Sequence, residues 1–378
     1  MKSNVSEIKR SIQAKDDKKY KILTFDTDNL YPERVLSIVN GSGTAKSCVK
    51  LHARFITGGG FEDLKFWKAK INRKGTRVDQ MFRALAKQYA THAGYSLHVN
   101  YNELFEISEI NLIPFKHCRQ GLPDDYGYIG KIAVYDNWDR YYGKIKPENI
   151  DYIDVFNPDP EVIQKQVDAV GGWDKYNGQV IYYKGEDESE EYPVPEFDSV
   201  LMDMETDALI QMFRNKNVDS SFMLQAILTT YGRFESDSER QNFNSGIEKF
   251  QGQNAKRILH VEVDESQGEK KPDLESFNTP NLDKLFEQTE RSCKKSIISA
   301  FNQPQILHNG EQADKIGAND ELETAYNYYN SITQDDRQLF EELFMSIIPL
   351  YRDDINPSGN YAVKELTFKN VLNGTPDK

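Results

Sequence analysis

Residues 254–323 contain an ordered series of elements that constrains the fold more than any other part of the chain. The apolar strand NAKRILHVEV is followed by an amphipathic helix over residues 282–301, a turn at Pro304 and a second long helix near Asp320–Ile348. The stripe of the first helix consists of Leu282, Leu285, Phe286, Thr289, Cys293, Ile297 and Phe301. At 1.5 Å per residue, a helix of about 20 residues is roughly 30 Å long. The chain must therefore cover a long apolar stripe.

Another helix and a compact strand–helix–strand pattern precede this series. Asp203–Asn217 is amphipathic, and the apolar strand SFMLQAILTT follows it. The segment SDSERQNFNSGIEKFQG predicts a helix capped by Ser236 or Ser238, and AKRILHVEV predicts the second strand. The charged stretch Asp264–Asp273 is read as a loop. Two long helices are therefore expected to flank a small β–α–β unit.

Residues from about 30 to 200 predict one α+β domain. Helices are expected over ERVLSIVN after Pro32, over TAKSCVKLHARFIT and over Val78–Ala93. From Gly94 the period changes to alternation, which predicts strands in YSLHVNYN, EISEINLIPF, GKIAVYDNW and NIDYIDVFN. Asn177–Gly178 suits the type I′ turn of a hairpin between WDKY and QVIYYKG.

The charge balance limits the classes of partner. The 378 residues carry a net charge of −13, which argues against tight, sequence-specific binding to DNA phosphates but allows DNA to slide past. No apolar run approaches the roughly 20 residues that span a bilayer, and the charged N-terminus shows no secretory signal. Cys48, Cys118 and Cys293 are too far apart for a zinc site and fit a reducing place of assembly.

Motifs for enzymatic chemistry are incomplete. GSGTAKS resembles a phosphate loop, but Asn40 and Ala45 stand where that loop needs glycines, so a turn and a helix N-cap explain it better. The acidic run Glu186–Glu191 lacks the spacing of a calcium loop and is read as a solvated hairpin tip. We expect no catalytic residue, no cofactor and no metal site. A metal-dependent DNA-processing enzyme stays an alternative, and its candidate carboxylates are Asp151, Asp154, Asp159 and Glu161.

Basic side chains gather on two of the predicted helices. Arg214 and Lys216 end the first, and Arg291, Lys294 and Lys295 lie opposite the apolar stripe of the second. An ordinary solvated face explains them, and a helix C-terminus favours the first two. Sparse contact with phosphates along a channel wall is the functional alternative.

The order of these elements resembles the stem, clip, stem, tunnel loop and wing helix of the tailed-bacteriophage (HK97-like) portal protein family. Three segments carry the resemblance. TAKSCVKLHARFITGGGF resembles the wing helix that ends in a Gly-rich turn, GRF…FQGQNAKRILHV resembles the helix-to-strand part of the clip, and SIISAFNQPQILHN resembles the helix that ends at a proline. In the last segment, Asn302 stands where the family usually has Gly, and Gln303 where it has an apolar residue.

The resemblance implies an α+β portal fold with little or no crown. Its parts would be a flexible N-terminal arm (1–29), an α+β wing (30–200), stem helix 1 (201–218), a β–α–β clip (219–279), stem helix 2 (280–303), a tunnel loop (304–319), a long wing helix (320–352) and a short C-terminal tail or reduced crown (353–378).

The resemblance also implies a function without catalysis. The chain would form a dodecameric ring at one capsid vertex, the channel for DNA packaging and ejection, assembled in the host cytoplasm and retained in the virion. Its partners would be double-stranded DNA, the terminase large subunit, a head–tail adaptor and the major capsid protein. Another virion part, such as a head–tail connector, is the alternative. Candidate channel-lining residues are His308, Asn309, Glu311, Gln312, Lys315, Arg291, Lys294 and Lys295. Candidate clip contacts are Arg233, Glu235, Arg240, Lys270 and Lys271.

Overall fold

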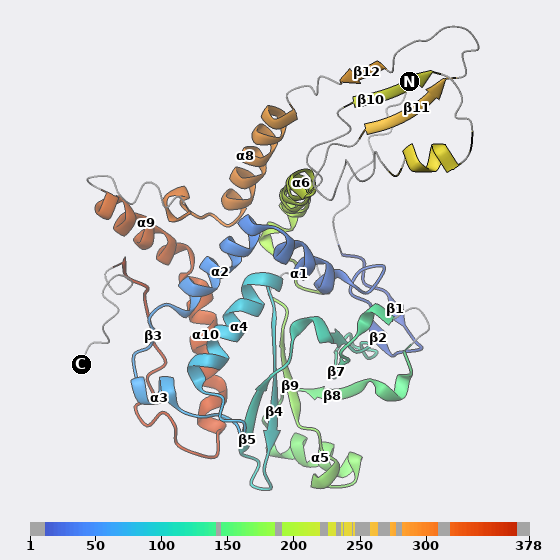
Figure 1. Ribbon diagram of the computed structural model, residues 1–378. Coiled ribbons are helices and arrows are strands. Elements are labelled where there is room, and N and C mark those ends of the chain that lie inside the picture. Colours follow the sequence, from blue (N-terminus) through green and yellow to red (C-terminus); the bar gives the residue numbers. More distant parts are fainter. Residues whose placement is uncertain are drawn as a thin grey trace, which may run out of the picture. The chain divides into compact units, whose positions relative to one another are not determined.

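The chain divides into two units, one of which is discontinuous in sequence. The first unit is Met1–Met204 with Ser296–Lys378, and the second is Glu205–Lys295 (Figure 1). The computed structural model describes residues 12–140, 145–185, 191–219, 226–231, 236, 238–243, 245, 258–263, 273–276, 282–308 and 318–368.

A mixed six-stranded sheet forms the centre of the first unit and confirms the predicted α+β class. Its order is β5 (Ile107–Leu112), β4 (Tyr95–Tyr101), β9 (Gln179–Tyr183), β8 (Asp151–Val155), β7 (Lys131–Val134) and β6 (Cys118–Gln120). All neighbours are antiparallel except β8 and β9, which are parallel because α5 (Pro160–Val170) connects them.

The predicted hairpin at Asn177–Gly178 is wrong. WDKY forms a short 3₁₀ helix, η4 (Trp173–Lys175), and β9 pairs with β4 and β8 instead. Gly178 is needed for a close backbone approach, because a Cβ there would lie 2.1 Å from the Val99 carbonyl oxygen of β4. The Asn-Gly pair therefore marks tight packing between strands that are distant in sequence.

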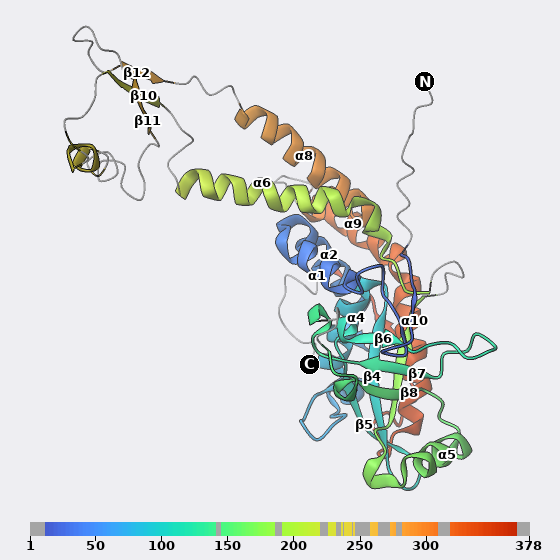
Figure 2. The same ribbon diagram turned by 90° about the vertical axis from the view of Figure 1, so that its right-hand side faces the viewer.

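Helices α2 (Gly43–Thr57), α4 (Val78–His92) and α10 (Gln334–Ile347) belong to the core of the first unit, and α4 and α10 pack together (Figure 1 and Figure 2). The ring of Phe82 on α4 lies 5.2 Å from that of Phe340 on α10, which lies 5.3 Å from that of Tyr95 on β4. Helix α1 (Tyr31–Gly41) precedes α2. The Ala45 amide donates to Ser42 Oγ at 3.0 Å, which confirms the N-cap reading of GSGTAKS.

The prediction of a flexible arm is wrong for residues 12–29. They form β1 (Asp16–Asp17) and β2 (Ile22–Leu23), and Tyr20, Ile22 and Phe25 are buried. The buried guanidinium of Arg119 on β6 donates to the side-chain and backbone oxygens of Asn29. The apolar residues of YKILTF stand among charged neighbours, which hid the strand. Residues 1–11 lie outside the described part.

The single long helix predicted over 320–352 is also wrong. Two helices, α9 (Ala318–Ile332) and α10, meet at Thr333. The Thr333 hydroxyl donates to the Tyr329 carbonyl at 3.0 Å, and Arg337 Nη1 donates to the same hydroxyl at 2.8 Å. The backbone of Thr333 has φ of −95° and ψ of 13°, which depart from helical values and separate the two helices. Beyond α10, β13 (Val363–Lys364) pairs with β3 (Gly60–Phe61).

The second unit contains a small three-stranded sheet. β10 (Ala226–Tyr231) pairs in parallel with β11 (Ile258–Val263) and antiparallel with β12 (Asp273–Ser276). The parallel pair confirms the predicted strand–helix–strand order, since the helical residues 238–243 lie between the two strands and the Glu239 amide bonds Ser236 Oγ. β12 was not predicted.

Two helices cross the boundaries between the units along the chain. They are α6 (Leu201–Asp219) and α8 (Leu282–Ala300), which confirm that helices lie in both segments where the sequence predicted them. The boundaries fall between Met204 and Glu205 in α6 and between Lys295 and Ser296 in α8. The β–α–β sheet is therefore inserted in the sequence between two helices.

Candidate functional site

The three basic residues predicted to line a channel on α8 differ in their ionic partners. Lys294 Nζ lies 2.7 Å from Glu290 Oε1, and Arg291 Nη2 lies 3.0 Å from Glu287 Oε1. Lys295 is exposed. Arg291 is therefore paired with a carboxylate one turn away, whereas Lys294 shares the Glu290 carboxylate with Arg214 of α6.

Within the second unit, the contacts between α6 and α8 include an aromatic pair and an ion pair. The rings of Phe213 and Phe286 lie 4.9 Å apart, and Arg214 pairs with Glu290. Together with Lys294, Arg214 lowers the pKa of the Glu290 carboxyl. Arg214 therefore contributes to holding α6 and α8 together rather than standing as an isolated cation.

The end of α8 forms a helix-terminating turn, which contains the two unusual residues Asn302 and Gln303. The backbone amide of Gln303 donates to the Ile298 carbonyl at 3.2 Å, and the backbone amide of Asn302 donates to the Ser299 carbonyl at 3.0 Å. These two bonds define a Schellman motif, in which one residue must adopt positive φ. Asn302 has φ of 51°, and Asn tolerates this region better than other non-glycine residues. The departure from Gly is therefore compatible with the turn.

Gln303, the second departure from the family pattern, is the centre of a buried polar network. Its Nε2 donates to the Cys48 carbonyl of α2 and to Tyr329 Oη of α9, both at 2.9 Å. Its Oε1 lies 2.7 Å from His308 Nε2. On the far side of Tyr329, the hydroxyl lies 2.8 Å from His52 Nδ1. An apolar residue could make none of these bonds.

His308 is the only predicted channel residue of the 304–319 segment in the described part of the chain. It is half-buried and bonded to Gln303, and burial lowers its pKa. Its place in a channel stays a prediction. The other candidates of this segment, Asn309, Glu311, Gln312 and Lys315, lie outside the described residues.

The candidate clip contacts are mostly outside the described residues as well. Arg240 lies exposed on the helical stretch 238–243. Arg233, Glu235, Lys270 and Lys271 are not described. Contact between these residues and a motor or adaptor therefore stays a prediction.

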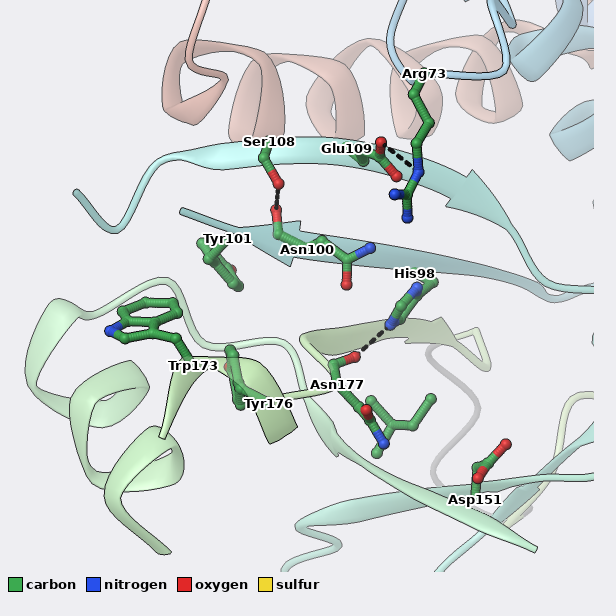
Figure 3. A pocket seen from close by; sticks show the side chains of 11 residues that line it. Arg73, His98, Asn100, Tyr101, Ser108, Glu109, Asp151, Trp173, Tyr176 and Asn177 are labelled. Atoms are coloured by element: carbon green, nitrogen blue, oxygen red, sulfur yellow. Dashed lines mark hydrogen bonds and ion pairs between the residues drawn. The ribbon is translucent and has the colours of Figure 1, made fainter. Parts of the chain in front are cut away.

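A pocket of about 580 Å³ lies on the face of the large sheet around His98 and Asn100 of β4 (Figure 3). Figure 3 shows Trp173 and Tyr176 on one side of Asn100, and the pair of Arg73 and Glu109 above it. Arg73 Nε lies 3.1 Å from Glu109 Oε1. Aromatic rings, side-chain amides and the ion pair of Arg73 and Glu109 line the pocket. No sequence motif indicated it.

The carboxylates named as candidates for a metal-dependent DNA-processing enzyme do not gather at one site. Asp151 lines the pocket of Figure 3, Asp154 pairs with Lys131 at 2.7 Å, and Asp159 accepts the Glu161 amide as the N-cap of α5. Across the described residues, no group of three or more His, Cys, Asp or Glu side chains could hold a metal ion. The partners of Asp154 and Asp159 are those of ordinary surface carboxylates.

The three cysteines are buried thiols without disulfides, as the sequence indicated. In the same described part of the chain, no helix has the length and apolar character needed to cross a membrane.

No protein-family model and no curated protein matches the chain. Among solved structures, it is similar to a chain in the neck of an empty gene transfer agent (GTA) particle, with 13% identity, 75% of this chain and 74% of that chain covered, and a TM-score of 0.46. For the neck of the native GTA particle computed with C12 symmetry, the identity is 14%, the coverage 76% and 74%, and the TM-score 0.45. For an HK97 family phage portal protein from Corynebacterium diphtheriae, the values are 10%, 72% and 74%, and 0.33.

Proposed function

We propose that this chain is a phage portal protein, which forms a ring at one capsid vertex through which DNA is packaged and ejected. The observation that carries the proposal is the order of elements. Helix α6 leads out of an α+β unit, a β–α–β sheet follows, and α8 leads back to a proline turn before α9. The sequence resemblance assigns these parts to stem, clip, stem and tunnel loop.

Exposed apolar residues on α6 support association into a ring. Leu209 and Met212 are 56% and 54% exposed and share one side of the helix, whereas Ile210 is buried. A helix that is apolar on more than one side is expected to have a further packing partner. A different surface of the neighbouring copy would provide it in the head-to-tail contacts of a closed cyclic ring, which we propose to be a dodecamer.

The charges suit a channel that guides DNA without holding it. The chain has a net charge of −13, Arg291 on α8 is paired with Glu287, and Lys294 shares Glu290 with Arg214. Tight binding to DNA requires many unbalanced cations facing phosphates. Salt screens the remaining contacts beyond about 8–10 Å, so DNA would be contacted only where it passes close to the wall.

The remaining partners follow from the proposed ring. The β–α–β unit would bind the terminase large subunit during packaging and a head–tail adaptor afterwards, and the α+β unit would contact the major capsid protein. The ring would assemble in the host cytoplasm and stay in the virion. Exposed Arg240 is the described residue best placed to test the first contact.

The test is the size of the assembly formed by purified protein. Native mass spectrometry and negative-stain images of the wild-type chain are expected to show rings. The double variant Leu209→Asp/Met212→Asp should yield monomers with an unchanged circular dichroism spectrum. Leu104→Asp, at a residue 73% exposed between β4 and β5, is the matched control and should still form rings. Compact wild-type monomers at high concentration under every salt condition would overturn the proposal.

A further inference from the structure

A buried side-chain amide, that of Gln303, takes part in attaching residues 304–308 to the fold. Gln303 is only 5% exposed, and its side chain contacts α2, α9 and His308 at the same time. Cys48 is 255 residues away in sequence and Tyr329 is 26 residues away. The amide thus joins three segments of the first unit at the point where the chain leaves α8.

The chemistry of the partners fixes the direction of each hydrogen bond. The Cys48 carbonyl can only accept, so Gln303 Nε2 must face it, and the second Nε2 hydrogen goes to Tyr329 Oη. Gln303 Oε1 can only accept, so His308 Nε2 donates to it. The orientation of the amide is therefore defined, because a flipped amide would place its oxygen against the Cys48 carbonyl, which cannot donate.

The direction continues beyond Tyr329. Since Tyr329 Oη accepts from Gln303, its own hydrogen is free to go to His52 Nδ1 at 2.8 Å. His52 then carries its proton on Nε2, which lies 3.5 Å from Asp336 Oδ2 at the start of α10. The series of hydrogen bonds runs from His308 through Gln303 and Tyr329 to His52. Each member has one orientation, which is what makes such a network specify a single geometry.

We propose that Gln303 is a positioning residue whose amide fixes the start of the 304–319 segment to α2 and α9. An apolar residue at this site would fill the space but leave the orientation of His308 undefined. The relevance to a DNA channel rests on the proposed function; the attachment itself does not. The structure therefore assigns to Gln303 the task of setting where this segment begins.

The test measures local opening beside Gln303, by amide hydrogen exchange in the dissociated full-length chain. The probes are the Leu307 and His308 amides, which bond the Pro304 and Gln305 carbonyls at 3.0 Å. Gln303→Glu keeps the shape but replaces the donating Nε2 by an acceptor. It should accelerate exchange at both probes by at least about tenfold, the factor that corresponds to roughly 1.4 kcal/mol. Amides in the middle of α10 should change by less than about twofold.

Two further variants keep the result interpretable. Gln305→Glu makes the same chemical change at an exposed residue of the same turn and should leave both probes unchanged. Tyr329→Phe removes one of the two acceptors of Nε2 and should give a smaller acceleration, which decides the matter if Gln303→Glu does not fold. Unchanged exchange at the probes, or equal acceleration throughout the first unit, would overturn the proposal. A wild-type chain that fails to form rings would instead refute the proposed function.

Discussion

Replacing Arg119 tests how much the buried guanidinium, which bonds Asn29 and Glu33, contributes to the stability of the fold. Arg119 is fully buried and donates to Asn29 Oδ1 at 2.7 Å, to the Asn29 carbonyl at 2.6 Å and to the Glu33 carboxylate at 3.1 Å. It also donates to the Lys116 and Cys118 carbonyls, both at 2.8 Å. Arg119→Met removes every donor and leaves the Glu33 carboxylate without its cation. Breaking a buried ion pair from one side costs about 3–5 kcal/mol, and we expect a loss of this size in the free energy of unfolding.

The assay is urea unfolding at pH 7, followed by tryptophan fluorescence. Trp138 reports locally, because its ring lies 5.0 Å from the Arg119 guanidinium. The matched control is Lys131→Met, which removes an exposed pair with Asp154 and should cost less than about 1 kcal/mol. A loss below about 1 kcal/mol for Arg119→Met would refute the reasoning, because it would mean that the buried partners find other donors.

Three further predictions concern single sites. Burial lowers the pKa of His92 from 6.5 to about 3, so the unfolded chain binds a proton that the folded chain excludes, and stability should fall by about 2–3 kcal/mol between pH 6.5 and 4.5. Urea unfolding at both pH values should show a smaller fall for His92→Phe, and equal falls would contradict the assignment. Gly60→Ala should lower the melting temperature more than Gly75→Ala, because a Cβ at Gly60 would lie 2.6 Å from the Trp67 ring whereas Gly75 faces open space. Asn302→Gly should change the free energy of thermal unfolding by less than about 1 kcal/mol, while Asn302→Val should destabilise by roughly 1–2 kcal/mol; equal effects would refute a need for positive φ.

The spacing of apolar residues predicted the elements that bury only one face. The helices α2 and α4 were expected within one or two residues of their bounds, because their buried residues recur at helical spacing. The alternating segments similarly indicated β4 and β8. Pairing between strands was not accessible in this way, since β9 joins β4 and β8 across long stretches of sequence. Local turn chemistry at Asn177–Gly178 therefore favoured the wrong neighbour.

The polar network illustrates what a sequence leaves open at a site. The polar character of Gln303 is the only feature of the sequence that sets apart the position before Pro304. That Gln303 meets Cys48 and Tyr329 depends on how α2 and α9 pack, and no spacing in the sequence encodes it. Similarly, Thr333 interrupts a pattern that otherwise reads as one continuous helix, because its φ of −95° and ψ of 13° depart from helical values.

The discontinuity of the first unit has a consequence for synthesis on the ribosome. Met204 emerges 347 − 204 = 143 residues before Ile347, the last residue of α10. At about 5–20 residues per second, the nascent chain waits roughly 7–30 s for that helix. During this interval the aromatic surface of α4 and β4 that Phe340 covers stays open to solvent. Chaperone capture before α10 appears, and aggregation of chains truncated after the second unit, are the behaviours expected of such a gene product.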